Sequence, residues 1–113
     1  MKIISEQITL GELQQMSEKG FGNLVKAVID IEKGIMALDA DLHADQEALL
    51  LEDGSRQENL WGINIYPALS KEQRIEFDSM INLRPSFGNQ SRGVDSPEIQ
   101  KKIIEAVNRL IKE

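Results

Sequence analysis

Cysteine is absent from this chain of 113 residues. Its absence excludes a disulfide framework, thiolate metal sites and cysteine nucleophiles, and it is typical of proteins in a reducing compartment. Long apolar runs are also missing, because no stretch approaches the roughly 20 residues of a membrane-spanning helix. The first residues contain no apolar segment like that of a secretory signal peptide. We therefore expect a cytoplasmic protein that does not enter a membrane.

An excess of positive charge is also lacking, since 13 Lys and Arg stand against 19 Asp and Glu, a net charge of −6. General nucleic-acid binding requires basic side chains that neutralise phosphates, so we do not expect it in this acidic chain. The charge is uneven along the sequence. Acidic residues gather in 39–58, whereas basic residues outnumber acidic ones in 84–113. We expect these two segments to face each other within the fold or across a homodimer.

Two segments carry helix signals. Thr9 and Glu12 form a capping box, which predicts a helix over residues 10–19. Ser96 followed by Pro97 is typical of a helix start. An apolar stripe at helical spacing follows that start and predicts a second helix at the C-terminal end.

The remaining apolar segments predict strands. These segments are 2–8, 24–31, 35–39, 42–53, 60–66 and 75–83. Residues 24–39 could also form one helix, but Gly34 in its interior would cost about 1 kcal/mol. We therefore expect a single α+β domain over residues 1–113, an antiparallel β-meander of about four to six strands packed with an N-terminal and a C-terminal helix.

Alternation within two of these segments predicts which side chains are buried. In 60–66, Trp61 shares one face with two isoleucines, which favours a place in the core over an exposed anchor for a partner or a base. In 75–83, the same period directs Leu83 inward and Asn82 outward.

Two stretches resemble a known family. They are LHADQEALLLEDGSRQENLWGINIYP (42–67) and FDSMINLRPSFGNQSRGV (77–94), and a terminal helix follows them. Together they are similar to a family of short prokaryotic proteins of unknown function, over nearly the whole chain. The resemblance brings no activity with it, and no catalytic or binding residue can be carried over.

The only histidine lies in an acidic stretch. If this stretch is extended, Asp41, His43 and Asp45 project to one face at intervals of about 6–7 Å. Carboxylates with an imidazole are ligands for a divalent cation or an acid/base pair. Because neighbours on one strand face are too far apart to share an ion, further ligands would have to come from elsewhere. The alternative, which we favour, is a solvated strand face.

The loop over residues 84–95 is the second candidate site. Arg84 and Arg92 flank a polar, glycine-containing turn with Asn89 and Ser91, and a helix start follows. Such a loop can bind a phosphate or a carboxylate. It matches no phosphate-binding motif, however, and the alternative that we favour is a connection whose arginines pair with the acidic middle of the chain.

These patterns do not decide whether the chain is an enzyme. The interpretation that we favour is a non-catalytic binding or interaction domain that forms a homodimer, because a small sheet has edge strands to cover. One alternative is a metal-dependent hydrolase that uses His43 and acts on an anionic substrate. The other is small-anion or nucleotide binding through 84–95. No cofactor is indicated by any motif.

Overall fold

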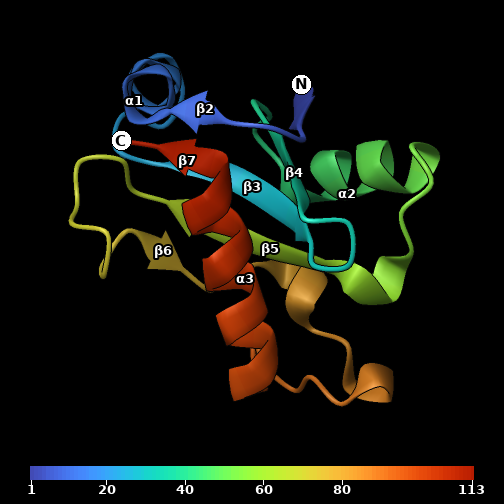
Figure 1. Cartoon of the computed structure of the whole chain (residues 1–113). Helices are drawn as coiled ribbons and strands as arrows, with labels where there is room; N and C mark the ends of the chain where they lie inside the picture. The colour runs from blue at the N-terminus through green and yellow to red at the C-terminus, as the bar shows by residue number, and fades with distance from the viewer.

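The computed structural model describes all of residues 1–113 and is built around one antiparallel sheet (Figure 1). The strand order is β1-β4-β3-β5-β6, so the long strand β3 lies at the centre. The strands of this sheet are β1 (Lys2–Ile4), β4 (Ile35–Leu38), β3 (Val25–Asp30), β5 (Leu60–Ile65) and β6 (Ile75–Glu76). Two short strands, β2 (Ile8–Thr9) and β7 (Ile111–Lys112), form a separate parallel pair. The α+β class and the approximate strand number are confirmed.

Both predicted helices are present with the expected caps. Helix α1 (Leu10–Lys19) begins after Thr9, whose hydroxyl accepts a hydrogen bond from the Glu12 amide and donates one to the Glu12 carboxylate. Helix α3 (Pro97–Leu110) begins after Ser96, whose hydroxyl accepts from the amide of Ile99. None of the helices combines the length and the apolar character needed to span a bilayer.

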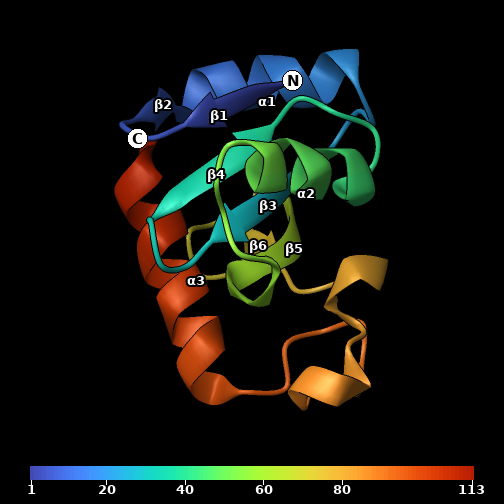
Figure 2. The same ribbon diagram turned by 90° about the vertical axis from the view of Figure 1, so that its right-hand side faces the viewer.

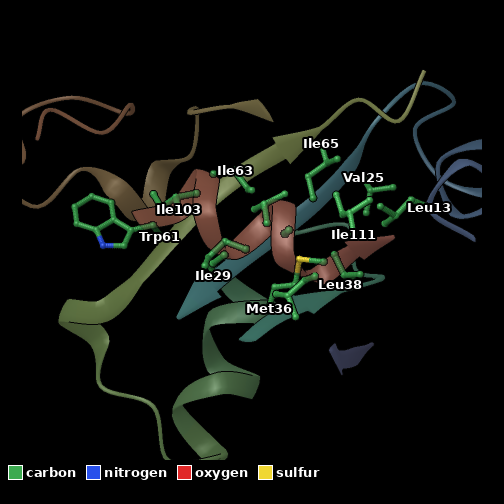
Figure 3. Close-up of a cluster of buried hydrophobic side chains, with 14 of the residues drawn as sticks. Leu13, Val25, Ile29, Met36, Leu38, Trp61, Ile63, Ile65, Ile103 and Ile111 are labelled. Atoms are coloured by element: carbon green, nitrogen blue, oxygen red, sulfur yellow. The ribbon is translucent and has the colours of Figure 1, made fainter. Parts of the chain in front are cut away.

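The first face of the sheet is covered by α3, with α1 lying along one end of the molecule (Figures 1 and 2). Alternate residues of the central strands point to this face and meet the apolar stripe of α3 in one continuous core (Figure 3). Trp61 belongs to this core together with Ile63 and Ile65, as the alternation predicted.

The second face of the sheet is covered only in part, by helix α2 (His43–Glu52) (Figure 2). Leu50 of this helix packs with Val28, Ala37 and Leu60 of the sheet in a small buried cluster. Towards the other end of β3 and β5, the same face carries polar side chains in place of apolar ones.

Residues 24–39 form the strand pair that the sequence favoured. Strands β3 and β4 are joined by a turn in which Gly34 has a positive φ of 68°. Asp30 closes the turn, because its carboxylate accepts from the amides of Glu32 and Lys33 and from the Ser55 hydroxyl.

The predicted strand over 42–53 is wrong, since this segment is helix α2. His43, Gln46 and Leu50 are its buried residues, at the spacing of one helical face. Two of these three positions are polar. The apolar period of 3.6 residues was therefore concealed in the sequence, and the interspersed alanines and acids imitated a period of two.

The predicted strand over 75–83 is also wrong beyond β6. The chain leaves the sheet, and Asn82 is fully buried whereas Leu83 is exposed, the reverse of the expectation. The Asn82 amide occupies the place of a neighbouring strand beside Gly62. It accepts from the Gly62 amide at 2.8 Å and donates to the Gly62 carbonyl at 2.9 Å. A side chain here replaces the backbone pairing that the alternation suggested.

Candidate functional site

A cavity of about 540 Å³ opens on the second face of the sheet, beside the first turn of α2. The polar residues that line it come from strands β3, β5 and β6, from α2 and from the segment after β6. They are Lys26, His43, Asn64, Tyr66, Glu76, Asp78, Ser79 and Arg92. The cavity exists because α2 covers only one end of this face.

Apolar side chains also line this cavity. Phe21, Leu42 and Met80 are among them, and they are respectively 48%, 56% and 63% exposed. Exposed apolar side chains that gather around one cavity together with a few convergent polar groups are typical of small-molecule sites. The combination makes this cavity the candidate functional site.

His43 is held in the cavity wall by one specific hydrogen bond. Its Nε2 lies 2.7 Å from the carbonyl oxygen of Ile63, and because a carbonyl only accepts, Nε2 carries the proton. The second ring nitrogen, Nδ1, has no hydrogen-bond partner and is the acceptor of the neutral ring. Burial lowers the pKa of His43 from its ordinary value of 6.5, so the neutral ring predominates at neutral pH.

Three residues of the wall form a row across the sheet. Lys26 of β3 is the register partner of Asn64 of β5, and Asn64 is the register partner of Glu76 of β6. Residues opposite one another on neighbouring strands point to the same face. A cation, an amide and an anion therefore follow one another along one line of the cavity wall.

The anionic end of this row is fixed by hydrogen bonds. Oε1 of Glu76 accepts from Nδ2 of Asn64 at 2.8 Å and from the Tyr66 hydroxyl at 2.9 Å. The bond to Glu76 raises the pKa of Tyr66. Asn64 is only 8% exposed, and its Oδ1 is buried without a partner.

A further ion pair lies in the same wall. Nε of Arg92 is 2.9 Å from Oδ1 of Asp78, and both side chains are about half exposed. Asp78 and Arg92 thereby satisfy one another, and the terminal nitrogens of the guanidinium make no other hydrogen bond within the chain.

The residues predicted to bind a metal are brought together only in part. His43 lines the cavity, but Asp41 and Asp45 are exposed outside its lining, and the extended geometry that placed all three on one face is wrong. No three His, Cys, Asp or Glu side chains in the chain form a group that could hold a metal ion.

Within the loop 84–95, Arg84 has a structural role. Its guanidinium is buried, donates to the carbonyls of Gln57 at 2.6 Å and Leu60 at 2.7 Å, and lies 4.4 Å from the centre of the Trp61 ring. Burial lowers its pKa. The predicted pairing of the loop arginines with acidic side chains of 39–58 does not occur, because Arg84 binds backbone carbonyls and Arg92 binds Asp78.

Asn89 and Ser91 also hold the loop in shape. Nδ2 of Asn89 donates to the carbonyls of Asn82, Ser91 and Gly93. The Ser91 hydroxyl donates to Asp95 at 2.6 Å. This bond lowers the pKa of the exposed Asp95 carboxyl. Of the four predicted ligand-binding residues, only Arg92 lines the cavity.

The structure thus joins His43 and Arg92, which came from two separate predicted sites, in one cavity. Sequence reasoning missed Lys26, Asn64, Tyr66 and Glu76. A partial signal was present, because the alternation in 60–66 placed Asn64 and Tyr66 opposite the core-facing Trp61 and the alternation in 75–83 directed Glu76 outward. Their convergence with Lys26 on one wall depends on strand register, which the sequence does not determine.

A family described as "Protein of unknown function (DUF5674)" matches residues 2–110. The chain belongs to this family. The resemblance noted from the sequence is thereby confirmed, while a prokaryotic origin stays a prediction. No curated protein matches the chain, and no solved structure matches it.

Proposed function

We propose that this chain is a small-molecule-binding domain whose ligand occupies the cavity beside α2. The observation that carries the proposal is a cavity of about 540 Å³ whose wall combines exposed apolar side chains with the free Nδ1 of His43 and the charged row of β3, β5 and β6. Apolar walls with a few convergent polar groups are typical of small-molecule sites. A ligand that donates a hydrogen bond would find an acceptor in Nδ1 of His43, which has no partner within the chain.

Binding is a better account of the cavity than catalysis, because three of its four charged side chains are fixed by hydrogen bonds within the chain. Asp78 is paired with Arg92, and Glu76 accepts from two side chains. Groups fixed in this way present a rigid, preorganised surface, which favours recognition. Only His43 has the free nitrogen of a general base.

The two alternatives from the sequence have less support. A metal-dependent hydrolase would need ligands beyond His43, and Asp41 and Asp45 do not join it in the cavity. Anion binding through 84–95 would need the guanidinium of Arg84, which donates to two carbonyls instead. Both stay hypotheses without a structural feature that favours them.

Blocking the cavity tests the proposal. Ala44 lies in the first turn of α2, is exposed and lines the cavity, so an Ala44→Trp variant should fill it without touching the core. Ala48 is exposed one turn further along the same helix and lies outside the cavity, so Ala48→Trp is the matched control. Ligand-observed NMR with a library of small fragments should give hits for wild type and Ala48→Trp that disappear with Ala44→Trp.

The binding site of each hit should also be visible on the protein. Amide resonances of β5 and of the first turn of α2 should shift in wild type, while those of α3 should not. Hits that bind all three proteins equally, or a library without any hit, would overturn the proposal. The amide spectra of the two tryptophan variants, recorded without fragments, establish that both are folded.

Self-association stays part of the proposal as a separate prediction. The sheet has two short edge strands, β1 and β6, through which a second copy could pair. Light scattering decides it, because a homodimer has twice the chain mass of 12.7 kDa.

A further inference from the structure

The charges of the cavity wall differ in how far they are compensated. Arg92 and Asp78 neutralise one another at 2.9 Å. Lys26 has no carboxylate within ion-pair distance, and its ammonium lies 5.3 Å from the centre of the Phe21 ring. Glu76 has no basic partner, and only its Oε1 accepts hydrogen bonds. One cation and one anion are therefore left for a ligand.

These two charges are held apart by the sheet itself. Lys26 and Glu76 lie on β3 and β6, with Asn64 of β5 between them in the register. Strands are about 4.7–4.9 Å apart, so the two backbones are separated by roughly 10 Å. This distance leaves room for a small molecule between the charged ends, over the middle of the row at Asn64.

We infer that the ligand of this cavity is a small zwitterion, a molecule with one ammonium and one carboxylate group on an apolar body. The inference rests on the proposed function and adds the ligand class. The carboxylate lies towards Lys26 and the ammonium towards Glu76, whose Oε2 accepts no hydrogen bond within the chain. The apolar body lies against Phe21, Leu42 and Met80, which the fold leaves exposed in the cavity wall.

A singly charged ligand would leave one end of the row unmatched. An anion would be attracted by Lys26 but repelled by Glu76. An amine would be attracted by Glu76 but repelled by Lys26. Since opposite charges attract and like charges repel over these distances, the bipolar wall selects for a molecule that carries both.

Matched probes test the ligand class. L-leucine, L-methionine and L-phenylalanine supply the zwitterion on three apolar bodies. 3-Phenylpropanoate lacks the ammonium of phenylalanine, and 2-phenylethylamine lacks its carboxylate. In calorimetric titrations at pH 7, at least one of the three amino acids should bind. Each single-charge analogue should bind at least about tenfold more weakly than the amino acid that binds best, since charge-assisted hydrogen bonds are lost.

Variants assign each charge to its partner. Lys26→Gln should weaken binding of the zwitterion about tenfold and leave the amine unaffected, whereas Glu76→Gln should weaken the zwitterion and leave 3-phenylpropanoate unaffected or improved. Lys101→Gln, on the exposed side of α3, is the control and should change nothing. Amide spectra of all variants show that the fold is kept.

The possible failures are distinguishable. If fragment hits vanish with Ala44→Trp but no amino acid binds, or if removing a charge leaves affinity unchanged, the zwitterion inference is wrong and the binding function stands. If amino acids bind equally to wild type and Ala44→Trp, their site is elsewhere and the zwitterion inference is wrong. The binding function is also wrong only if the fragment hits persist with Ala44→Trp or no fragment binds.

Discussion

The two faces of the sheet are built from the same strands and serve different purposes. On the face towards α3, alternate side chains of β3, β4 and β5 are apolar and enter one core. On the opposite face, the same strands contribute Val28, Ala37 and Leu60 to a small cluster with Leu50 of α2, and they carry polar residues beside the first turn of that helix. One face therefore provides most of the stability, which leaves the other free to carry a polar cavity.

The largest expected effect is a difference in unfolding free energy between the core under α3 and the small cluster under α2. Ile103→Ala, on the α3 side, should lower the free energy of unfolding by about 4 kcal/mol, and Leu50→Ala, on the α2 side, by about 3 kcal/mol. Both side chains are fully buried, but the small cluster can relax around a cavity more easily. Urea denaturation measures both, and a larger loss for Leu50→Ala would reverse the comparison.

A middle effect is expected at Gly62, on the polar face. A Cβ at this position would lie 2.5 Å from the side chain of Ser79, so Gly62→Ala should cost about 1–3 kcal/mol of unfolding free energy. Gly11→Ala is the matched control, because its Cβ would meet nothing closer than 4.0 Å. Helix propensity should make that control neutral or slightly stabilising. Equal melting temperatures for both variants would show that Ser79 moves freely.

The smallest effect concerns pH and His43, the only histidine. Its pKa in the folded protein is lowered from 6.5, chiefly by burial. As the pH falls below 6.5, the unfolded chain therefore binds more protons than the folded chain. Stability should therefore decrease as pH falls below that value, and His43→Gln should flatten the decrease. Thermal melts of both proteins at pH 7.5 and 5.5 measure it. Parallel curves would mean that the imidazole does not contribute.

The sequence predicted those elements whose signals are local. Thr9 with Glu12 and Ser96 with Pro97 act within one turn of the chain, so the bounds of α1 and the start of α3 followed directly. It failed for α2, where the buried stripe includes a histidine and a glutamine. Their burial depends on distant backbone, since His43 contacts the Ile63 carbonyl and Gln46 donates to the Lys26 carbonyl.

The candidate site was less predictable for the same reason. His43 and Arg92 were noticed as chemically capable residues, but in separate hypotheses, because they are far apart in the chain. Lys26 and Glu76 looked like ordinary surface charges. Their meaning comes from the register of β3, β5 and β6, which places them at the two ends of one row.

The amide of Asn82 has a consequence for the behaviour of the protein in concentrated solution. Strand β6 pairs with only the last two residues of β5, which would leave the rest of that strand open to any extended chain that approached. The Asn82 side chain is hydrogen-bonded to the amide and the carbonyl of Gly62, and the Arg84 guanidinium donates to the carbonyl of Leu60. Because these backbone groups already have partners, a strand from another copy cannot pair with this part of β5, and the edge of the sheet is protected against aggregation.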